Sequence, residues 1–239
     1  MKFLEFFKLL INKILKPLGF ILVNRERLID YRLYEYNSYD HYRDIQIHYN
    51  KKKIDHVWAD ESTLIRVGNI LLSTFPSSKR INGICHGTRN GFEQKFLINF
   101  SEKITCIGTD ISDTAGNFDN SYQWDFHDEK EEWLSCFDFV YSNSLDQSWK
   151  PKAALQTWLS QLHINGVLII EHTKAHGPQG ASEMDPFGVR PMVLPYILTM
   201  WFGSQISIEH SVAPKKNNNL DAWLFVIKKN VEKVEILND

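Results

Sequence analysis

The chain has 239 residues, of which 43% are hydrophobic and 23% are charged, and it contains 12 glycines and 8 prolines. These values are those of an ordinary globular protein, and they exclude a disordered chain, a collagen-like repeat and a small disulfide scaffold. The formal net charge is −2, so the chain has no overall positive field that would recruit nucleic acid. We therefore expect one or two globular domains that do not bind nucleic acid.

The N-terminal part is basic and begins with an amphipathic pattern. Residues 1–53 carry 11 Lys or Arg and 6 Asp or Glu, whereas the rest of the chain is acidic. Apolar residues between Met1 and Lys16 recur at helical spacing until Pro17 and Gly19, which end the predicted helix. This helix is expected to contact its own domain, a twin subunit in a homo-dimer, or a membrane surface. No apolar run reaches the length that a membrane-spanning helix requires.

Three cysteines, Cys85, Cys106 and Cys136, have no close spacing, and their number is odd. This pattern of cysteines is not typical of a disulfide framework or a zinc site. We therefore expect no bound metal, a reducing compartment and a cytoplasmic protein.

The pattern of apolar and polar residues in the sequence changes near residue 79. Residues 24–58 are rich in Tyr and charged side chains, and together with a helix at residues 60–74 they predict a helical cap within an extension at 1–78. In residues 79–239, short apolar runs alternate with helical segments, which is typical of a parallel sheet covered on both faces. The predicted strands are Ile81–Cys85, Ile104–Thr109, Tyr122–Trp124, Phe137–Tyr141 and Val167–Glu171. The predicted helices between them include Phe92–Phe100 and Lys152–Leu162. An antiparallel hairpin at the sheet edge is predicted from Gln205–His210 and Ala222–Lys228.

A tight turn is predicted directly after the first strand, between Gly87 and Gly91. Glycine permits backbone angles and a close ligand approach that a Cβ atom would prevent. Asn90 and Glu93 have the spacing of a capping box at the start of the next helix. The exposed N–H groups of such a helix start are suited to binding a carboxylate or a phosphate.

Acidic residues follow the next two strands at the same predicted edge of the sheet. Asp110 closes the second strand, where a carboxylate can accept hydrogen bonds from both hydroxyls of a ribose. Asp125 follows the third strand and can accept a hydrogen bond from an adenine amino group, with Phe126 against the ring. The dinucleotide fingerprint G-x-G-x-x-G is absent from the turn, so the pattern favours a nucleoside over NAD.

Five segments carry a family resemblance through their order and spacing. They are His86–Gly91, Gly108–Ser112, Trp124–Phe126, Phe137–Asn143 and Leu162–Ile170. Over residues 80–230 the chain resembles the class I S-adenosylmethionine-dependent methyltransferases, although Cys85-His86 stands where that family usually has an acidic residue. The resemblance implies a Rossmann-like α/β fold with a seven-stranded, mostly parallel sheet, one antiparallel edge strand, flanking helices and an N-terminal helical extension.

The resemblance also implies S-adenosylmethionine as the cofactor and transfer of its methyl group to a nitrogen, oxygen or carbon atom. Such an enzyme mainly has to align donor and acceptor and exclude water, and it adds a general base when the acceptor is a hydroxyl. The cofactor-binding residues implied by the resemblance are His86, Gly87, Thr88, Gly91, Asp110, Ile111, Asp125, Phe126 and Asn143.

Catalytic and acceptor-binding residues are implied in the loops after the fourth and fifth strands. Asp146 and His172 are the candidate catalytic residues, and the ordinary pKa of a histidine suits proton removal at neutral pH. The stretch His176–Gly188 is too long and too rich in turn residues for a plain connector, which predicts a substrate loop. The residues expected to contact the acceptor are Glu171, Asp185 and Arg190.

We expect the acceptor to be a small molecule. The chain loosely resembles methyltransferases of bacterial surface-glycan pathways, which suggests a sugar or a phosphorylated glycan precursor. Two alternatives remain open. A nicotinamide-dependent oxidoreductase would need a pyrophosphate-binding turn, and the glycine pattern of such a turn is absent. In a non-catalytic nucleoside-binding protein, Asp110 would be a structural cap.

Overall fold

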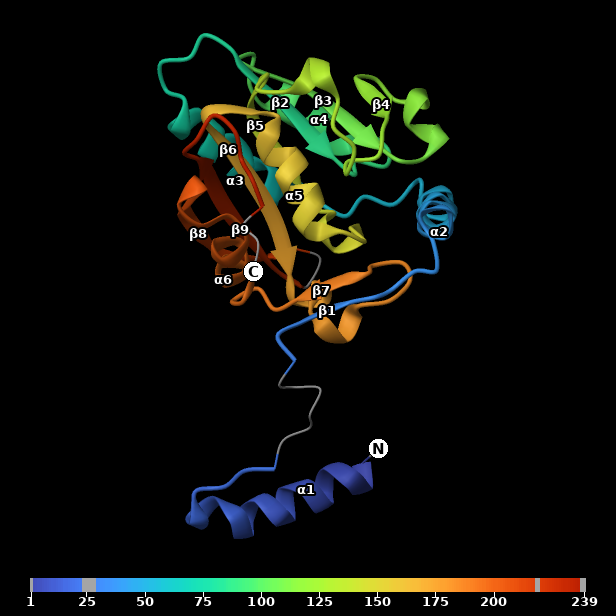
Figure 1. Ribbon diagram of the computed structural model, residues 1–239, viewed down its shortest axis with the longest axis vertical. Coiled ribbons are helices and arrows are strands. Elements are labelled where there is room, and N and C mark those ends of the chain that lie inside the picture. Colours follow the sequence, from blue (N-terminus) through green and yellow to red (C-terminus); the bar gives the residue numbers. More distant parts are fainter. Residues whose placement is uncertain (1, 23–28, 218–219, 237–239) are drawn as a thin grey trace. The chain divides into compact units, whose positions relative to one another are not determined.

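The computed structural model describes residues 2–22, 29–217 and 220–236, and the chain divides into two compact units, Met1–Asp30 and Tyr31–Asp239 (Figure 1). The smaller unit contains helix α1 (Lys2–Leu15). A short turn at Lys16–Leu18, followed by Gly19, ends this helix, as predicted. The larger unit includes residues 31–78, which the sequence analysis assigned to the N-terminal extension. Within the described ranges, no helix combines the length and apolarity needed to cross a membrane.

A seven-stranded sheet with the order β4-β3-β2-β5-β6-β9-β8 forms the centre of the larger unit. Strands β2 to β6 run parallel, whereas β9 runs antiparallel to its neighbours β6 and β8. This confirms the predicted Rossmann-like fold and the hairpin at the sheet edge. In such sheets, ligands bind beyond the carboxyl ends of the strands where the strand order reverses, here between β2 and β5. The strands are β2 (Ile81–His86), β3 (Ile104–Asp110), β4 (Ser121–Gln123), β5 (Phe137–Ser142), β6 (Leu162–Thr173), β8 (Ile206–Asn217) and β9 (Leu220–Lys229).

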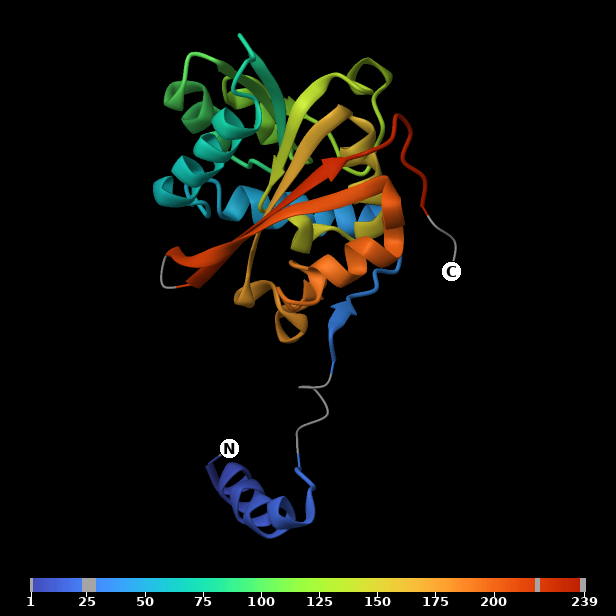
Figure 2. The ribbon, with the colours of Figure 1, turned by 90° about the vertical axis from the view of Figure 1, so that its left-hand side faces the viewer.

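Helices cover both faces of this sheet (Figure 2). Residues of α3 and α4 share one buried cluster with Phe139 and Tyr141 of β5, and residues of α5 and α6 share the other with Val140. Because successive side chains of a strand point to opposite faces, β5 contributes to both cores. The strand ends are therefore held rigidly from both sides. The helices are α2 (Tyr39–Lys52), α3 (Glu61–Thr74), α4 (Phe92–Phe100), α5 (Pro151–Ser160) and α6 (Leu194–Phe202).

The Tyr-rich segment differs from its prediction. Residues 24–58 were predicted as helical, but Tyr31–Leu33 form strand β1, which pairs antiparallel with β7 (Phe187–Val189). Helix α2 follows, with Ser38 as its N-cap, and residues 24–28 lie outside the described part of the chain. The partner of β1 lies far along the chain, so the local pattern of residues 24–58 does not reveal the pairing. This pairing joins the start of the larger unit to the predicted substrate loop.

The start of β6 also differs from its prediction. A helix was predicted to continue to Leu162, but α5 ends at Ser160 and Leu162 already pairs with Phe137 of β5. The pairing between β5 and β6 then shifts in register, and Asn165 adopts a positive φ of 65°. An irregular strand start of this kind interrupts the alternation by which a strand is recognised from sequence.

Candidate functional site

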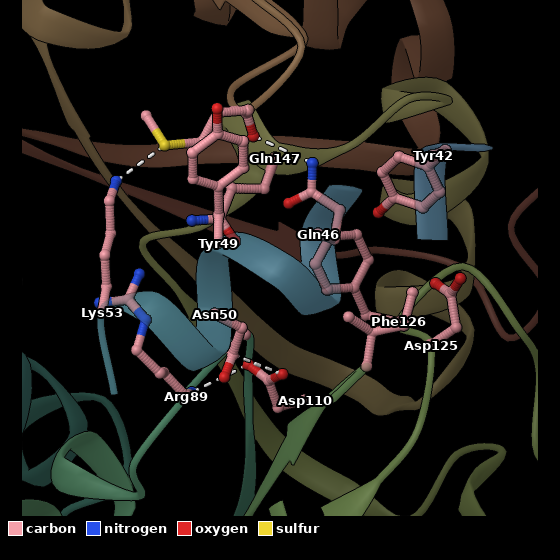
Figure 3. A pocket seen from close by; sticks show the side chains of 13 residues that line it. Tyr42, Gln46, Tyr49, Asn50, Lys53, Arg89, Asp110, Asp125, Phe126 and Gln147 are labelled. Carbon is pink, nitrogen blue, oxygen red and sulfur yellow. Dashed lines mark hydrogen bonds between the residues drawn. The ribbon is translucent and has the colours of Figure 1, made fainter. Parts of the chain in front are cut away.

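Two cavities lie where β2, β3 and β5 end. The first has a volume of about 30 Å³ and is bordered by helix α2 (Figure 3), and the second has a volume of about 560 Å³. Residues that line both cavities mark their junction, and these are Lys53, Gly87, Arg89, Gln147 and Met184. Of the predicted site residues, Gly87, Asp110, Ile111, Asp125 and Phe126 line the first cavity, and Gly87, Thr88, Asn143, Asp146 and Asp185 line the second.

The turn after β2 brings the backbone to the junction of the cavities. The N–H groups of Gly87 and Thr88 both donate to the carbonyl oxygen of Thr109, at 2.8 and 3.0 Å. Gly87 has a φ of +73°, and a Cβ atom there would lie 2.5 Å from Cβ of Ser144. Only glycine fits this position, because any side chain would be strained and would collide with the loop after β5.

The predicted capping box at the start of α4 is wrong. Gly91 is the N-cap, with a φ of 72° and no side-chain hydrogen bond to the helix. The Asn90 side-chain amide instead donates to the carbonyl of Ile54, at 2.9 Å. Glu93 turns inward, is 5% exposed and accepts a hydrogen bond from Asn143 Nδ2 at 3.2 Å. Glu93 therefore lines the second cavity, which the sequence analysis did not anticipate.

Asp110 is held by three hydrogen-bond donors. The backbone N–H groups of Arg89 and Ser112 donate to its carboxylate at 3.0 and 2.9 Å, and Asn50 Nδ2 donates at 2.7 Å. Burial raises the pKa of Asp110, and these donors act against that rise. A carboxylate offers roughly four lone-pair positions, so one remains for a further donor. Figure 3 shows Asn50 reaching Asp110 from α2, a contact that the sequence analysis missed.

Asp125 is the second acid at this end of the sheet. It accepts hydrogen bonds from Tyr39 at 2.8 Å and from His127, whose backbone N–H lies at 2.9 Å and Nδ1 at 2.6 Å. Burial acts to raise the pKa of Asp125, but the contacts with His127 and Tyr39 outweigh it and hold the pKa below its ordinary value. Phe126 packs edge-on against Trp158 at 5.3 Å and presents its remaining surface to the first cavity.

Side chains from α2 make the first cavity narrow. Tyr42, Gln46 and Asn50 are spaced by four residues, lie on one face of the helix and are all buried. Gln46 Nε2 also donates to the carbonyl of Met184 at 3.0 Å, which ties α2 to the predicted substrate loop. A space of about 30 Å³ holds about one water molecule, so a larger ligand reaches this cavity only when its walls move apart.

Four acids line the second cavity, and burial raises the pKa of three of them. The pKa rises to about 7 for Glu93, about 7 for Asp146 and about 6 for Asp185. Lys53 and Arg89 lie nearby, but Lys53 Nζ contacts Met184 Sδ at 2.8 Å and Arg89 Nη1 donates to the carbonyl of His56. Oε2 of Glu93 and Oδ1 of Asp146 are buried and have no hydrogen-bond partner among the described residues.

Five predicted site residues line neither cavity: His86, Gly91, Glu171, His172 and Arg190. His86 bonds Thr109 and Gln161 and stacks on Trp158, and burial lowers its pKa to about 4. Glu171 accepts a hydrogen bond from Tyr141 at 2.6 Å inside the core. Nε2 of His172 lies 2.8 Å from the carbonyl oxygen of Val189, and burial followed by the charge of His176 lowers its pKa to about 3.

The alternation of strand side chains accounts for Glu171 and His172. Successive residues of β6 point to opposite faces of the sheet, so these two side chains enter the two cores rather than the cavities at its edge. His176, one turn further on, does line the second cavity. No cluster of three or more His, Cys, Asp or Glu suited to a metal ion occurs among the residues that the structure describes.

Comparison with known proteins shows a shared fold. The N1-methyltransferase of 1,6-didemethyltoxoflavin from Burkholderia thailandensis, solved with 1,6-didemethyltoxoflavin and S-adenosylhomocysteine, matches 83% of this chain and 93% of its own, with a TM-score of 0.63 and 11% identity. The N-methyltransferase NodS from Bradyrhizobium japonicum, solved with S-adenosylhomocysteine, matches 78% of this chain and 99% of its own, with a TM-score of 0.55 and 14% identity.

The [4+2]-cyclase SpnF matches 70% of this chain and 81% of its own, with a TM-score of 0.53 and 10% identity. No protein-family model and no curated protein matches the sequence. Identities this low establish the fold alone, and the presence of a cyclase among the similar structures shows that the reaction has to be argued from the site.

Proposed function

We propose that this chain transfers a methyl group from S-adenosylmethionine to a small-molecule acceptor. The observation that supports the proposal is the placement of Gly87, Asp110 and Asp125 at adjacent strand ends around one cavity. This placement occurs on the fold of two methyltransferases that were solved with the demethylated cofactor. When bound, the cofactor supplies a methyl group that a sulfonium has already activated.

The first cavity suits the adenosine part of the cofactor. Asp110 retains one acceptor position for a ribose hydroxyl, and Ile111 and Phe126 provide apolar walls for adenine. Asp125 is occupied by Tyr39 and His127, so an adenine amino group would have to share or replace the bond from Tyr39. Because α2 fills this cavity, we propose that α2 moves outward when the cofactor binds.

The second cavity suits the methionyl part. The family's usual acid is replaced by Cys85-His86, but Oε2 of Glu93 is buried, lacks a partner and lines the same cavity as Thr88. We assign to Glu93 the binding of the methionyl ammonium. Lys53 and Arg89, at the junction of the cavities, provide positive charge for the methionyl carboxylate.

Asp146 and His172 differ in their access to the reacting atoms. Asp146 lines the second cavity, whereas His172 lines neither cavity and stays a prediction as a catalytic residue. We propose that Asp146 is the group that receives a proton from the acceptor. The expected glycan precursor and the contact of α1 with a membrane or a second subunit also stay predictions.

Isothermal titration calorimetry of the full chain with S-adenosylmethionine, S-adenosylhomocysteine and NAD tests the proposal. We expect both S-adenosyl compounds to bind and NAD not to bind, because the turn lacks the glycine pattern of a pyrophosphate site. Binding of NAD, or the absence of binding by either S-adenosyl compound, would contradict the proposal. Release of S-adenosylhomocysteine in the presence of an acceptor then distinguishes a methyltransferase from a non-catalytic nucleoside-binding protein.

A further inference from the structure

The second cavity contains a buried carboxylate, Asp146, for which burial outweighs the backbone hydrogen bonds and the charges of Lys53 and Arg89. Asp146 is 4% exposed, and within the described residues its one ion-pair contact is His176, with Nε2 3.5 Å from Oδ2. Burial lowers the pKa of His176 to about 4, so the imidazole is neutral at physiological pH. Oδ1 of Asp146 is buried and has no hydrogen-bond partner. An oxygen in this position is available to a ligand.

A second carboxylate lies close enough to influence the first. Asp185 lines the same cavity, and the charge of Asp146 adds to burial in raising its pKa. Three cations line this cavity, Lys52, Lys53 and Arg89. Lys53 and Arg89 lie at its junction with the first cavity and make other contacts, and neither lies within ion-pair distance of these acids in the described structure. Away from the junction the lining contains one cation, Lys52, and four acids, so this part of the cavity is acidic. The acids are Asp55, Glu93, Asp146 and Asp185.

We infer that the acceptor is a small amine, which binds as an ammonium ion between Asp146 and Asp185. This inference rests on the proposed function and specifies its acceptor class. A buried, unpaired carboxylate is costly, and an ammonium group offsets that cost with its charge and its three N–H donors. A carboxylate or phosphate acceptor would add a like charge to this end of the cavity, and an alcohol would leave the negative charge uncompensated. A phosphorylated glycan precursor is therefore disfavoured at this site.

Asp146 can also prepare the amine for reaction. One N–H proton of the ammonium passes to the Asp146 carboxylate, which leaves a neutral amine with a free electron pair and a neutral carboxylic acid. A proton acceptor works best when its pKa is near the working pH, and the pKa of Asp146 is about 7. Trp58 lines the same cavity and stacks on His176, with ring centroids 5.3 Å apart, so it provides a flat wall for the rest of the acceptor.

Three probes of similar size and different charge test this inference. The full chain is saturated with S-adenosylhomocysteine and then titrated by calorimetry with 2-phenylethylamine, 2-phenylethanol or phenylacetate. We expect the amine to bind at least tenfold more tightly than the alcohol, and phenylacetate not to bind measurably. The inference is overturned if the alcohol or phenylacetate binds as tightly as the amine, or if the amine does not bind.

Matched variants show which acids produce the preference. Asp146→Asn and Asp185→Asn should each reduce the affinity for 2-phenylethylamine at least tenfold and leave the affinity for 2-phenylethanol unchanged. Asp119→Asn removes one exposed acid outside both cavities and should change neither affinity. Unchanged amine binding in both cavity variants would contradict the inference. The titration with S-adenosylhomocysteine is read separately, because its failure would reject the proposed function and not the acceptor class.

Discussion

Each of the two cavities of the site contains a buried aspartate, and the protein lowers the pKa of one and raises the pKa of the other. At the first cavity, Asp125 accepts three hydrogen bonds and its pKa lies below the ordinary value. At the second, Asp146 is also buried and its one ion-pair contact is His176, and burial outweighs its backbone hydrogen bonds and the charges of Lys53 and Arg89, so that its pKa rises to about 7. Burial disfavours the charged form at both positions; at Asp125 the contacts with His127 and Tyr39 outweigh it, whereas at Asp146 no group outweighs it.

This difference in pKa indicates that the two ends of the site have different roles. The donors on Asp110 and Asp125 include Asn50 and Tyr39, so these acids hold the segment around α2 against the sheet. Asp146 holds no other element in this way and is available to a ligand or a proton. We therefore expect substitutions at the first end to weaken cofactor binding or folding, and those at the second end to increase stability while removing function.

The largest effect is expected for Asp110. Asp110→Ala removes the carboxylate that we assign to the ribose, and the loss of charge-assisted hydrogen bonds should weaken binding of S-adenosylhomocysteine by about 1.5–3 kcal/mol, or roughly 10- to 150-fold. Calorimetry measures this change, and Asp110→Asn, which keeps one acceptor oxygen, should lose less. Asp113→Ala, an exposed acid three residues further on, is the control. Unchanged affinity in Asp110→Ala would reject the ribose assignment.

At the other end, Asp146→Asn should stabilise the protein at alkaline pH. The pKa of Asp146 rises from an ordinary 3.8 to about 7 on folding, so the folded state binds more protons than the unfolded state between these values. Stability therefore falls as the pH rises through this window, and removing the charge should recover on the order of 2 kcal/mol at pH 8. Thermal unfolding at pH 8 and pH 4 measures the difference, which should nearly vanish at pH 4.

Neighbouring groups of Asp146 titrate as well, so each variant is compared with the unmodified protein at the same pH. Glu93 and Asp185 have raised pKa values, His176 has a lowered one, and the charges of Lys53 and Arg89 act to lower the pKa of Asp146. A lower melting temperature of Asp146→Asn at pH 8 would mean that the Asp146 carboxylate is compensated in the folded protein. That result would remove the contrast between the two ends of the site.

Asp125→Asn should change the stability in the opposite direction to Asp146→Asn, and by a smaller amount. The pKa of Asp125 is lowered on folding, so its charge stabilises the folded state above the ordinary pKa and this contribution is lost as the pH falls through it. We expect a loss of about 1.5 kcal/mol at pH 8, the usual contribution of a hydrogen bond to a charged group. Urea unfolding at pH 8 and pH 3 tests it, and equal losses at both pH values would show that charge is not the cause.

The fold could be predicted from the sequence because the periodicity of apolar residues in each strand and helix is a local property. Short apolar runs such as Ile81–Cys85 and helices such as Phe92–Phe100 show their periodicity directly, and every predicted strand overlaps an observed one. Strand β1 was missed because its pairing with β7 depends on residues far along the chain. Contacts that depend on assembly, rather than on periodicity, leave no local signal.

The same limit applies to the site. Gly87, Asp110 and Asp125 could be placed at one edge of the sheet from the sequence, because each follows a parallel strand and the topology fixes where these strands end. Which way a side chain turns at a strand end depends on its neighbours, so Glu93 was read as a helix cap and lines a cavity instead. A helical cap was predicted in this region, but the side chains by which α2 lines the site, Tyr42, Gln46 and Asn50, were not, although their four-residue spacing was visible in the sequence.

The smallest expected effect tests whether α2 competes with the cofactor. Asn50→Ala removes the donor at 2.7 Å from Asp110, which should reduce the free energy of unfolding by about 1 kcal/mol. The freed carboxylate position should at the same time tighten binding of S-adenosylhomocysteine about two- to fivefold, because the ligand no longer displaces Asn50. Lys51→Ala, which loses only the exposed ion pair with Asp113, should leave the affinity unchanged. Weaker binding in Asn50→Ala would instead make Asn50 part of the ribose site, so α2 would close over the cofactor rather than exclude it.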